Sequence, residues 1–323
     1  MTTEPGHIPV LPAQVLALLD PKPGQVALDC TLGRGGHAAL IVPRLAPGGR
    51  YIGLDLDPAN VAFVRERLGS GLKEPLPDGR GSSDGPVRLD FMHANFVSAR
   101  SVLDGLGVGR VDLLLADLGF ASTQMQDPGR GLSFNAEGPL DMRLGPTGSG
   151  GGAADLVNGL PEHDLADLIY QYGEERLSRR IARKIMEARG QSPITTTSEL
   201  ARIVRAAYGS RSRSQRIDPA TRTFMALRIA VNAELEALDQ LLSAVPLLLA
   251  PGGVAAFISF HSLEDRRVKQ ACTQLYKAGR AERLTPKPLV ADHAEVETNP
   301  RSRSAKLRAI RMLGTDQERA PQD

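Results

Sequence analysis

Short apolar runs separated by turn residues occupy the first 117 positions of the chain. Four of these runs predict buried strands, at Gln25–Cys30, Arg50–Asp55, Val87–His93 and Val111–Asp117. Helical spacing follows the first three strands, at 38–45, 59–68 and 96–106. Strands that alternate with helices in this way form right-handed crossover units and a parallel sheet covered on both faces. This part of the chain therefore predicts an α/β domain with a mostly parallel sheet.

Helical periodicity replaces the strands after residue 117. Leu177, Ile181 and Ile185 recur at every fourth position and share one helix face. A longer apolar stripe from Phe224 to Val245 predicts one long amphipathic helix. The α/β pattern then returns, because two more strands are predicted at 253–259 and 307–313. We therefore expect one α/β domain, formed by residues 1–124 and 221–323, that is interrupted by an inserted helical domain at 125–220.

Composition is that of a globular protein that needs no disulfides or metal. Of the 323 residues, 41% are apolar and 24% are charged, which argues against wholesale disorder. The two cysteines and six scattered histidines show neither a disulfide framework nor metal-ligand spacing. The start of the chain lacks a secretory signal, and prolines and glycines interrupt the apolar run Val245–Ile258. We therefore expect a cytoplasmic protein without a membrane span. Stretches rich in glycine at 69–86 and 145–152 predict a surface loop and a flexible connection.

The net charge of +2 conceals an uneven distribution along the chain. Residues 1–170 carry 13 basic and 20 acidic groups, residues 171–228 carry 13 and 5, and residues 229–323 carry 13 and 12. Arginine dominates the basic segment, and its planar fork suits phosphate. Two interpretations stay open from charge alone, a surface that attracts a polyanion and a solvated helix face.

A glycine-rich turn follows the first predicted strand. Gly33, Gly35 and Ala38 formally match the G-x-G-x-x-A fingerprint, and such glycines let the backbone approach a ligand at a helix N-terminus. Asp55 ends the next strand, where a carboxylate can accept two ribose hydroxyls. The pattern is shared by dinucleotide sites and S-adenosylmethionine sites. A tight turn and a loop cap ahead of Pro58 are the structural alternatives.

Further polar residues follow the later strands. Asp117 lies at the end of the fourth strand, where ligands of open parallel sheets bind, although a turn or cap would also use an aspartate there. His261 follows the strand at 253–259, and two interpretations of it stay open, a side chain that faces the same cleft and a hydrogen-bonded structural group. The spacing of Ser262 and Asp265 also resembles a helix cap. The basic run at 299–304 suits either phosphate contact or solvation.

Taken together, these runs resemble the bacterial small-subunit rRNA cytosine-N4 methyltransferases, the RsmH/MraW family. The matching pieces span almost the whole chain, at 7–11, 33–37, 55–58, 117–124, 138–143, 172–175, 220–224, 259–266 and 299–301. The chain departs from the family pattern at Cys30, at Pro12–Gln14 and at 120–123. None of these departures affects the glycines, Asp55 or Asp117.

The resemblance implies a class I S-adenosylmethionine-dependent methyltransferase fold, which is Rossmann-like, with an inserted all-helical domain. It implies S-adenosylmethionine as the methyl donor and N4 of one cytidine in the decoding region of 16S rRNA as the acceptor. By matching position, the donor would be bound by Gly35, Gly36, His37, Asp55, Phe96, Asp117 and Gln124. Asp117 is also the candidate catalytic residue. Candidate substrate-binding residues are Asp141, Arg143, Arg179, Arg180, Arg222 and His261.

Two other functions stay open from the residues alone. The fingerprint would also suit an NAD-dependent oxidoreductase, although a strongly basic insert has no evident use with a small substrate. A ribosome-assembly factor without catalysis would keep the fold and the basic segment. The expected partner is 16S rRNA or the small ribosomal subunit, and the oligomeric state is left open, with a dimer among the options.

Overall fold

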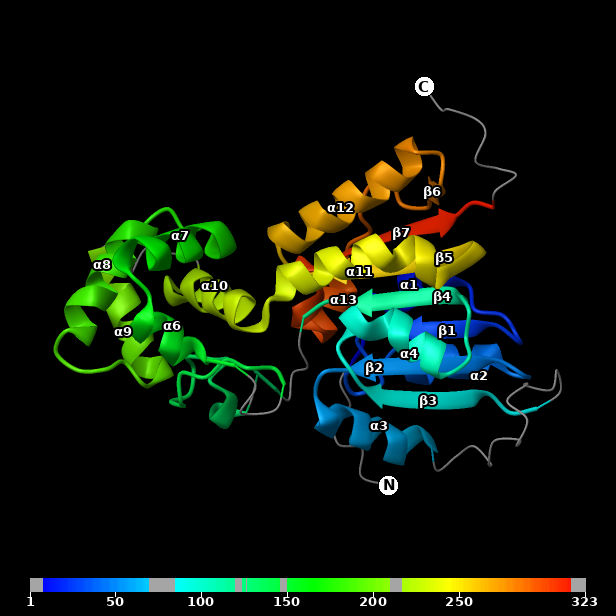
Figure 1. Ribbon diagram of the computed structural model, residues 1–323, viewed down its shortest axis with the longest axis horizontal. Helices are drawn as coiled ribbons and strands as arrows, with labels where there is room; N and C mark the ends of the chain where they lie inside the picture. Colours follow the sequence, from blue (N-terminus) through cyan, green and yellow to red (C-terminus); the bar gives the residue numbers. More distant parts are fainter. Residues whose placement is uncertain are drawn as a thin grey trace. The chain divides into compact units, whose positions relative to one another are not determined.

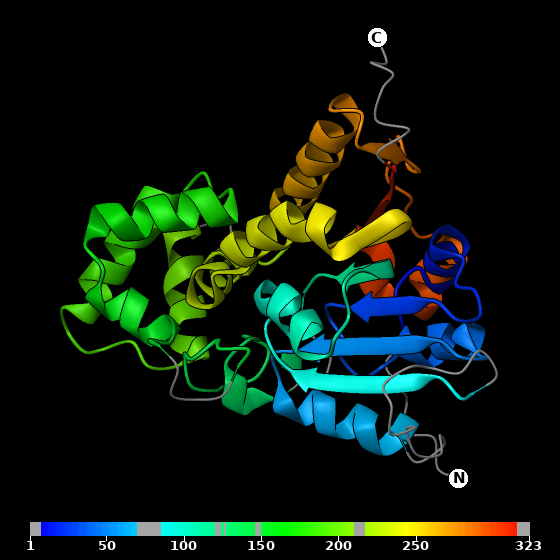
Figure 2. The same ribbon diagram turned by 45° about the vertical axis from the view of Figure 1, so that its right-hand side comes forward.

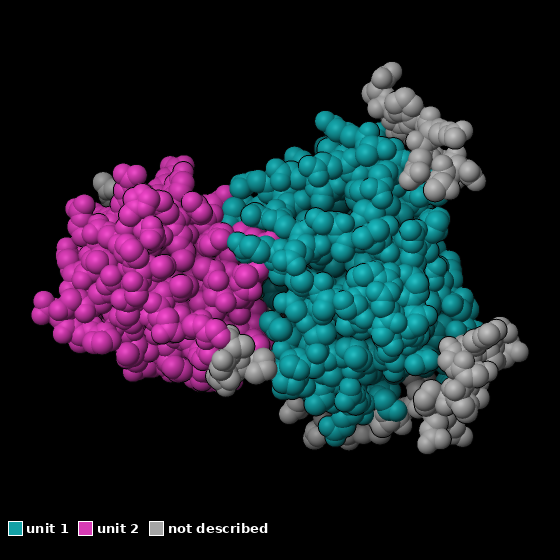
Figure 3. Space-filling model, viewed as in Figure 1, with its two compact units in different colours: residues 1–119, 236–323 teal, residues 120–235 magenta. Residues whose placement is uncertain are grey.

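The computed structural model describes residues 8–69, 85–119, 124–125, 127–145, 150–209 and 217–314. The chain forms two compact units, Met1–Gly119 with Glu236–Asp323, and Phe120–Leu235 (Figure 3). Most of the loop predicted at 69–86 and the middle of the connection predicted at 145–152 lie outside the described residues. No helix in the described parts of the chain is long and apolar enough to cross a membrane.

The first unit is built on a seven-stranded sheet in the order β3-β2-β1-β4-β5-β7-β6 (Figure 1). The strands are β1 Val26–Asp29, β2 Arg50–Asp55, β3 Arg88–His93, β4 Val111–Asp117, β5 Leu249–Ser259, β6 Ala281–Arg283 and β7 Lys306–Met312. Strands β1 to β5 pair in parallel, whereas β7 pairs antiparallel with both β5 and β6. The predicted mostly parallel sheet is confirmed. Its strand order reverses between β1 and β4, and this switch point is where open α/β sheets bind ligands.

Alternation along the strands sends successive side chains to opposite faces, and each face has its own core. One core joins residues such as Tyr51 and Leu115 to helices α1 Pro12–Leu19, α2 Ala38–Leu45 and α3 Pro58–Gly69. The other joins Ile52 and Leu114 to α4 Ala99–Gly105, α11 Glu234–Leu248 and α12 Ser262–Lys277 (Figure 2). Both faces are covered, as the near-continuous apolar strands predict.

The second unit is helical in its regular structure. Its helices are α6 Ala153–Gly159, α7 Glu162–Gly173, α8 Ser178–Arg189, α9 Thr197–Tyr208 and α10 Ala220–Asn232. Ile181 and Ile185 are fully buried in its core, which confirms the helix face predicted from their spacing.

Two expectations differ from the structure. The long helix predicted from Phe224 to Val245 is two helices, because Ala233 adopts a left-handed conformation with φ of 47° between α10 and α11. Residues of α10, including Phe224 and Leu227, pack in the core of the helical unit. The second unit consequently ends at Leu235 rather than at the expected residue 220. The sequence also gave no sign of α1, β6 or the short helix α13 His293–Thr298.

Candidate functional site

The turn between β1 and α2 is shaped by two glycines in left-handed conformation. Gly33 has φ of 51° and Gly35 has φ of 74°, a region that residues with a side chain rarely adopt. A Cβ atom at Gly35 would also lie 3.0 Å from Cγ2 of Val64 on α3. Glycine is therefore required for this tight turn. The turn leaves backbone without side chains at the carboxyl edge of the sheet, next to Gly36 and His37.

Asp55 is tied to this turn by hydrogen bonds. Its Oδ2 accepts from the Gly33 backbone N–H at 2.7 Å. Its Oδ1 accepts from the backbone N–H of Asp57 at 2.8 Å and from Nδ2 of Asn60 at 3.2 Å. Burial raises the pKa of Asp55, and the bonds from Asp57 and Gly33 oppose that rise. Since a carboxylate has about four acceptor positions, Asp55 can cap the loop and still accept a ligand hydroxyl.

His37, the residue before α2, and Asp117, the last residue of β4, face each other. His37 Nε2 lies 3.5 Å from Asp117 Oδ2, and the side chains are 8% and 15% exposed. Asp117 Oδ1 and His37 Nε2 are both buried without a hydrogen-bond partner among the described residues. Buried polar atoms are nearly always satisfied in native proteins. These two orphaned atoms therefore indicate that a polar ligand completes the site.

A chain of hydrogen bonds fixes the end of β4. The Asp117 backbone N–H donates to Thr31 Oγ1 at 2.7 Å. The Thr31 backbone N–H and hydroxyl donate in turn to Asp29 Oδ1, at 2.9 and 3.4 Å. The Tyr51 hydroxyl donates to Asp29 Oδ2 at 2.5 Å. Burial raises the pKa of Asp29, and the bond from Tyr51 partly opposes it. Sequence reasoning missed these supporting residues, although Thr31 lies within the glycine-rich turn that it singled out.

Phe96 belongs to the same edge of the sheet. It begins the 3-10 turn Phe96–Ser98, which Asn95 caps by accepting from the Val97 backbone N–H at 3.0 Å. The Ala94 backbone N–H donates to the carbonyl of Asp55 at 3.0 Å, which places the start of this turn beside the end of β2. The structure thus brings together the donor-site candidates of the first unit. Gln124 is buried in the second unit.

The basic run at 299–304 begins at a buried residue of the first unit, Asn299, whereas its Arg303 is exposed. Nδ2 of Asn299 donates to the carbonyl of Ile8 at 3.2 Å, and the Leu11 backbone N–H donates to Glu295 Oε1 at 2.6 Å. The segments 8–11 and 295–299, which are about 290 positions apart in the sequence, therefore lie side by side. Burial lowers the pKa of Arg301, and the negative charge of Asp117 opposes that shift. Arg301 is thus within electrostatic range of the site.

The substrate-binding candidates of the second unit fall into two groups. Asp141 and Arg143 pair with each other, since Arg143 Nε donates to Asp141 Oδ1 at 2.9 Å. The side-chain hydrogen bond from Arg143 lowers the pKa of Asp141. Arg179 and Arg180 are exposed on α8. Arg222 is 54% exposed and lies 3.8 Å from the buried carboxylate of Glu175.

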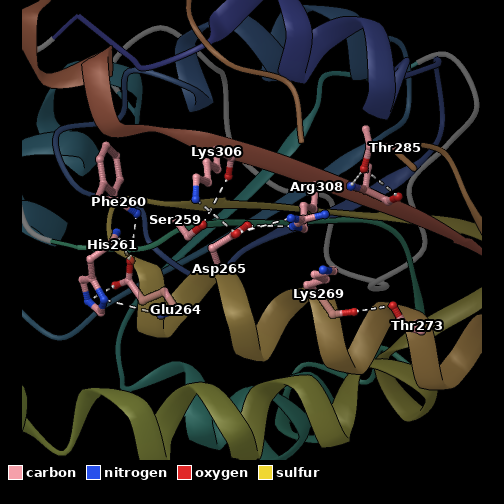
Figure 4. Close-up of polar contacts among 11 residues, drawn as sticks. Ser259, Phe260, His261, Glu264, Asp265, Lys269, Thr273, Thr285, Lys306 and Arg308 are labelled. Carbon is pink, nitrogen blue, oxygen red and sulfur yellow. Dashed lines mark hydrogen bonds and ion pairs between the residues drawn. The ribbon is translucent and has the colours of Figure 1, made fainter. Parts of the chain in front are cut away.

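His261 has a structural role that the sequence assigned to Ser262. It is the N-cap of α12, and its Nδ1 accepts from the Glu264 backbone N–H at 3.4 Å (Figure 4). Glu264 Oε2 accepts in return from the backbone N–H groups of Phe260 and His261, at 2.8 and 3.3 Å. The predicted cap formed by Ser262 and Asp265 is therefore wrong by one residue. Asp265 instead pairs with Arg308.

Comparison with known proteins finds relatives along nearly the whole chain. The MraW methylase family matches residues 4–313. The chain is 49% identical to ribosomal RNA small subunit methyltransferase H of Sorangium cellulosum over 308 residues, which cover 95% of this chain and 91% of that protein. It is 48% identical to the protein of the same name from Synechococcus sp., over 94% of each chain. A crystal structure of a putative rRNA methylase from Clostridium thermocellum matches 97% of this chain at 12% identity and a TM-score of 0.43. The chain belongs to the MraW methylase family.

Proposed function

We propose that this protein transfers a methyl group from S-adenosylmethionine to the exocyclic N4 of a cytidine in the decoding region of 16S rRNA. The curated relatives are named ribosomal RNA small subunit methyltransferases, and they match this chain over nearly its full length. One structural observation carries the proposal. The buried Oδ1 of Asp117, which has no hydrogen-bond partner among the described residues, lies at the switch point of the sheet, beside the turn that contains Gly35 and His37.

The residues of this edge fit the methyl donor. The glycine turn presents bare backbone, Asp55 retains one acceptor position for a ribose hydroxyl, and Phe96 offers a ring for the adenine. Asp117 Oδ1 and His37 Nε2 offer polar atoms that make no hydrogen bond within the described residues. By matching position, Gln124 is a further donor-binding candidate, and it belongs to the second unit. When bound, S-adenosylmethionine supplies an electrophilic methyl group and leaves as S-adenosylhomocysteine.

Asp117 would orient the acceptor. The cytosine amine is a poor nucleophile, because its lone pair is delocalised into the ring. A carboxylate that accepts one N–H bond holds the nitrogen in line and increases its electron density, and near-attack positioning supplies much of the rate. The nitrogen gains the methyl and loses one proton to water.

The helical unit would hold the RNA. Turning the target base out of a stacked strand costs roughly a few kcal/mol. Phosphate contacts from exposed arginines such as Arg179, Arg180 and Arg222 would offset that cost. His261, Asp141 and Arg143 remain candidate substrate contacts. Such a substrate places the activity in the cytoplasm.

The test is transfer of labelled methyl to 16S rRNA and to 30S particles that lack the modification. We expect label on cytidine N4 with wild-type protein. Asp117→Ala should abolish transfer while rRNA binding persists, and Asp104→Ala, at an exposed aspartate of α4, is the matched control. Absence of label with every substrate would refute the proposal.

Two measurements distinguish the proposed methyltransferase from a dehydrogenase and from a ribosome-assembly factor without catalysis. Calorimetry with NAD and with S-adenosylhomocysteine distinguishes a dehydrogenase from a methyltransferase, and we expect binding of the latter alone. Full rRNA binding combined with no methyl transfer by the wild-type protein would favour an assembly factor.

A further inference from the structure

A small cavity in the first unit lies away from the site described above. It is enclosed by α12, β6 with the chain that follows it, and β7, and has a volume of about 20 Å³. Its lining includes three cationic residues, Lys269, Arg283 and Arg308, and the hydroxyl residues Thr273 and Thr285. No carboxylate is among the described residues that line it. The cavity therefore has the polarity of an anion site.

One of the three cations is already neutralised. Arg308 Nε donates to Asp265 Oδ1 at 2.7 Å, and Lys306 Nζ lies 3.3 Å from Oδ2 of the same carboxylate (Figure 4). Lys269 and Arg283 form no ion pair with any carboxylate of the described ranges. The Arg283 guanidinium instead lies over the ring of Tyr276, 4.3 Å from its centroid. Two positive charges at the cavity thus remain uncompensated.

The lining also contains an unused donor. The Thr273 hydroxyl donates to the Lys269 carbonyl at 2.7 Å, and Thr285 Oγ1 accepts from the Ala309 backbone N–H at 2.8 Å. Arg283 Nε, by contrast, is buried and has no acceptor in the described part of the chain. A buried donor without an acceptor is costly, so an oxygen from outside the protein is expected opposite it.

We propose that this cavity binds a backbone phosphate of the substrate RNA. The inference rests on the proposed function for the identity of the polyanion. A volume of about 20 Å³ holds one oxygen-sized atom, so one phosphate oxygen enters and meets Arg283 Nε. The exposed Lys269 ammonium pairs with the rest of the phosphate at the rim.

The surrounding chain favours an anion of this size and charge. Residues 299–311 carry five basic groups and no acidic one, and residues 262–311 carry 12 basic and 6 acidic groups. The near-neutral total for 229–323 had concealed this second basic segment. RNA would consequently be held by the α/β unit as well as by the helical one.

The experiment measures the affinity for transcribed 16S rRNA as a function of salt concentration. Lys269→Ala removes a rim charge, and Lys277→Ala removes an exposed charge on the same helix that does not line the cavity. Each lost phosphate contact reduces the slope of log K against log salt by about 0.7 for single-stranded nucleic acid. We expect that reduction for Lys269→Ala and an unchanged slope for Lys277→Ala.

A third variant tests the buried donor. Arg283→Lys keeps the positive charge but removes the guanidinium group with its Nε donor. It should weaken rRNA binding severalfold while circular dichroism shows an intact fold. The proposal is overturned if Lys269→Ala keeps the wild-type slope, or if both lysine variants lose the same amount. Wild-type protein that shows the Lys269-dependent slope but transfers no methyl would refute the proposed function and leave the phosphate site standing.

Discussion

Thr31→Val tests whether the end of β4 is held in place by a hydroxyl. Valine keeps the shape of threonine but cannot accept the Asp117 backbone N–H, which lies 2.7 Å from Thr31 Oγ1. It also removes the weaker bond from the hydroxyl to Asp29 at 3.4 Å. The carboxylate that we expect to orient the acceptor would therefore lose its main-chain anchor.

The size of the effect follows from the lost bond. A buried donor left without an acceptor costs about 1–3 kcal/mol. About 1.4 kcal/mol corresponds to a tenfold change in rate. If the lost hydrogen bond stabilises only the transition state, methyl transfer therefore slows by about 5- to 150-fold. If the hydrogen bond stabilises the folded protein in all its states, its loss lowers the free energy of unfolding instead.

Urea unfolding and steady-state methyl transfer measure the two contributions separately. Thr31→Ser is the control, because it keeps the hydroxyl and loses only a methyl group. We expect Thr31→Val to lower kcat more than it raises KM for S-adenosylmethionine, and Thr31→Ser to restore most of kcat. The reasoning fails if valine leaves both stability and kcat at wild-type values, or if serine is as impaired as valine.

Two further predictions concern charge. Although burial alone would raise the pKa of Asp265, Arg308 and Lys306 hold it below its ordinary value of 3.8. The ionised carboxylate therefore stabilises the fold above that value, and this stabilisation is lost as the pH falls through the folded-state pKa. Asp265→Asn should consequently make the free energy of unfolding fall less steeply with decreasing pH in the acid range. An unchanged pH dependence in that range would contradict this. The second prediction concerns three arginines of α8 in the helical unit, Arg179, Arg180 and Arg183. Replacing all three by alanine should reduce the slope of log K for rRNA against log salt by about 0.7 per lost phosphate contact. An unchanged slope would show that these arginines form a solvated helix face.

Most of the secondary structure of the α/β unit followed from local pattern. The strands ending at Asp55 and Asp117 were placed to the residue, since a continuous apolar run and its flanking turn residues are properties of a few neighbouring positions. The break at Ala233 was missed, because an apolar stripe can pass without interruption from one helix to the next. His261 was missed as a cap because Ser262 is the commoner capping residue.

The sequence by itself determined the four strands β1 to β4, the glycine turn, and the aspartates that end β2 and β4, because each depends on residues close together in the chain. Only the tertiary structure decided which distant groups support them. Thr31 and Asp117 are 86 positions apart, and Leu11 and Glu295 are 284 apart. Thr31 and Asp117 meet because β1 and β4 are neighbours in the sheet, so that their carboxyl ends lie side by side. The cavity around Arg283 arises in the same way, since its cations come from three separate elements that only packing makes neighbours.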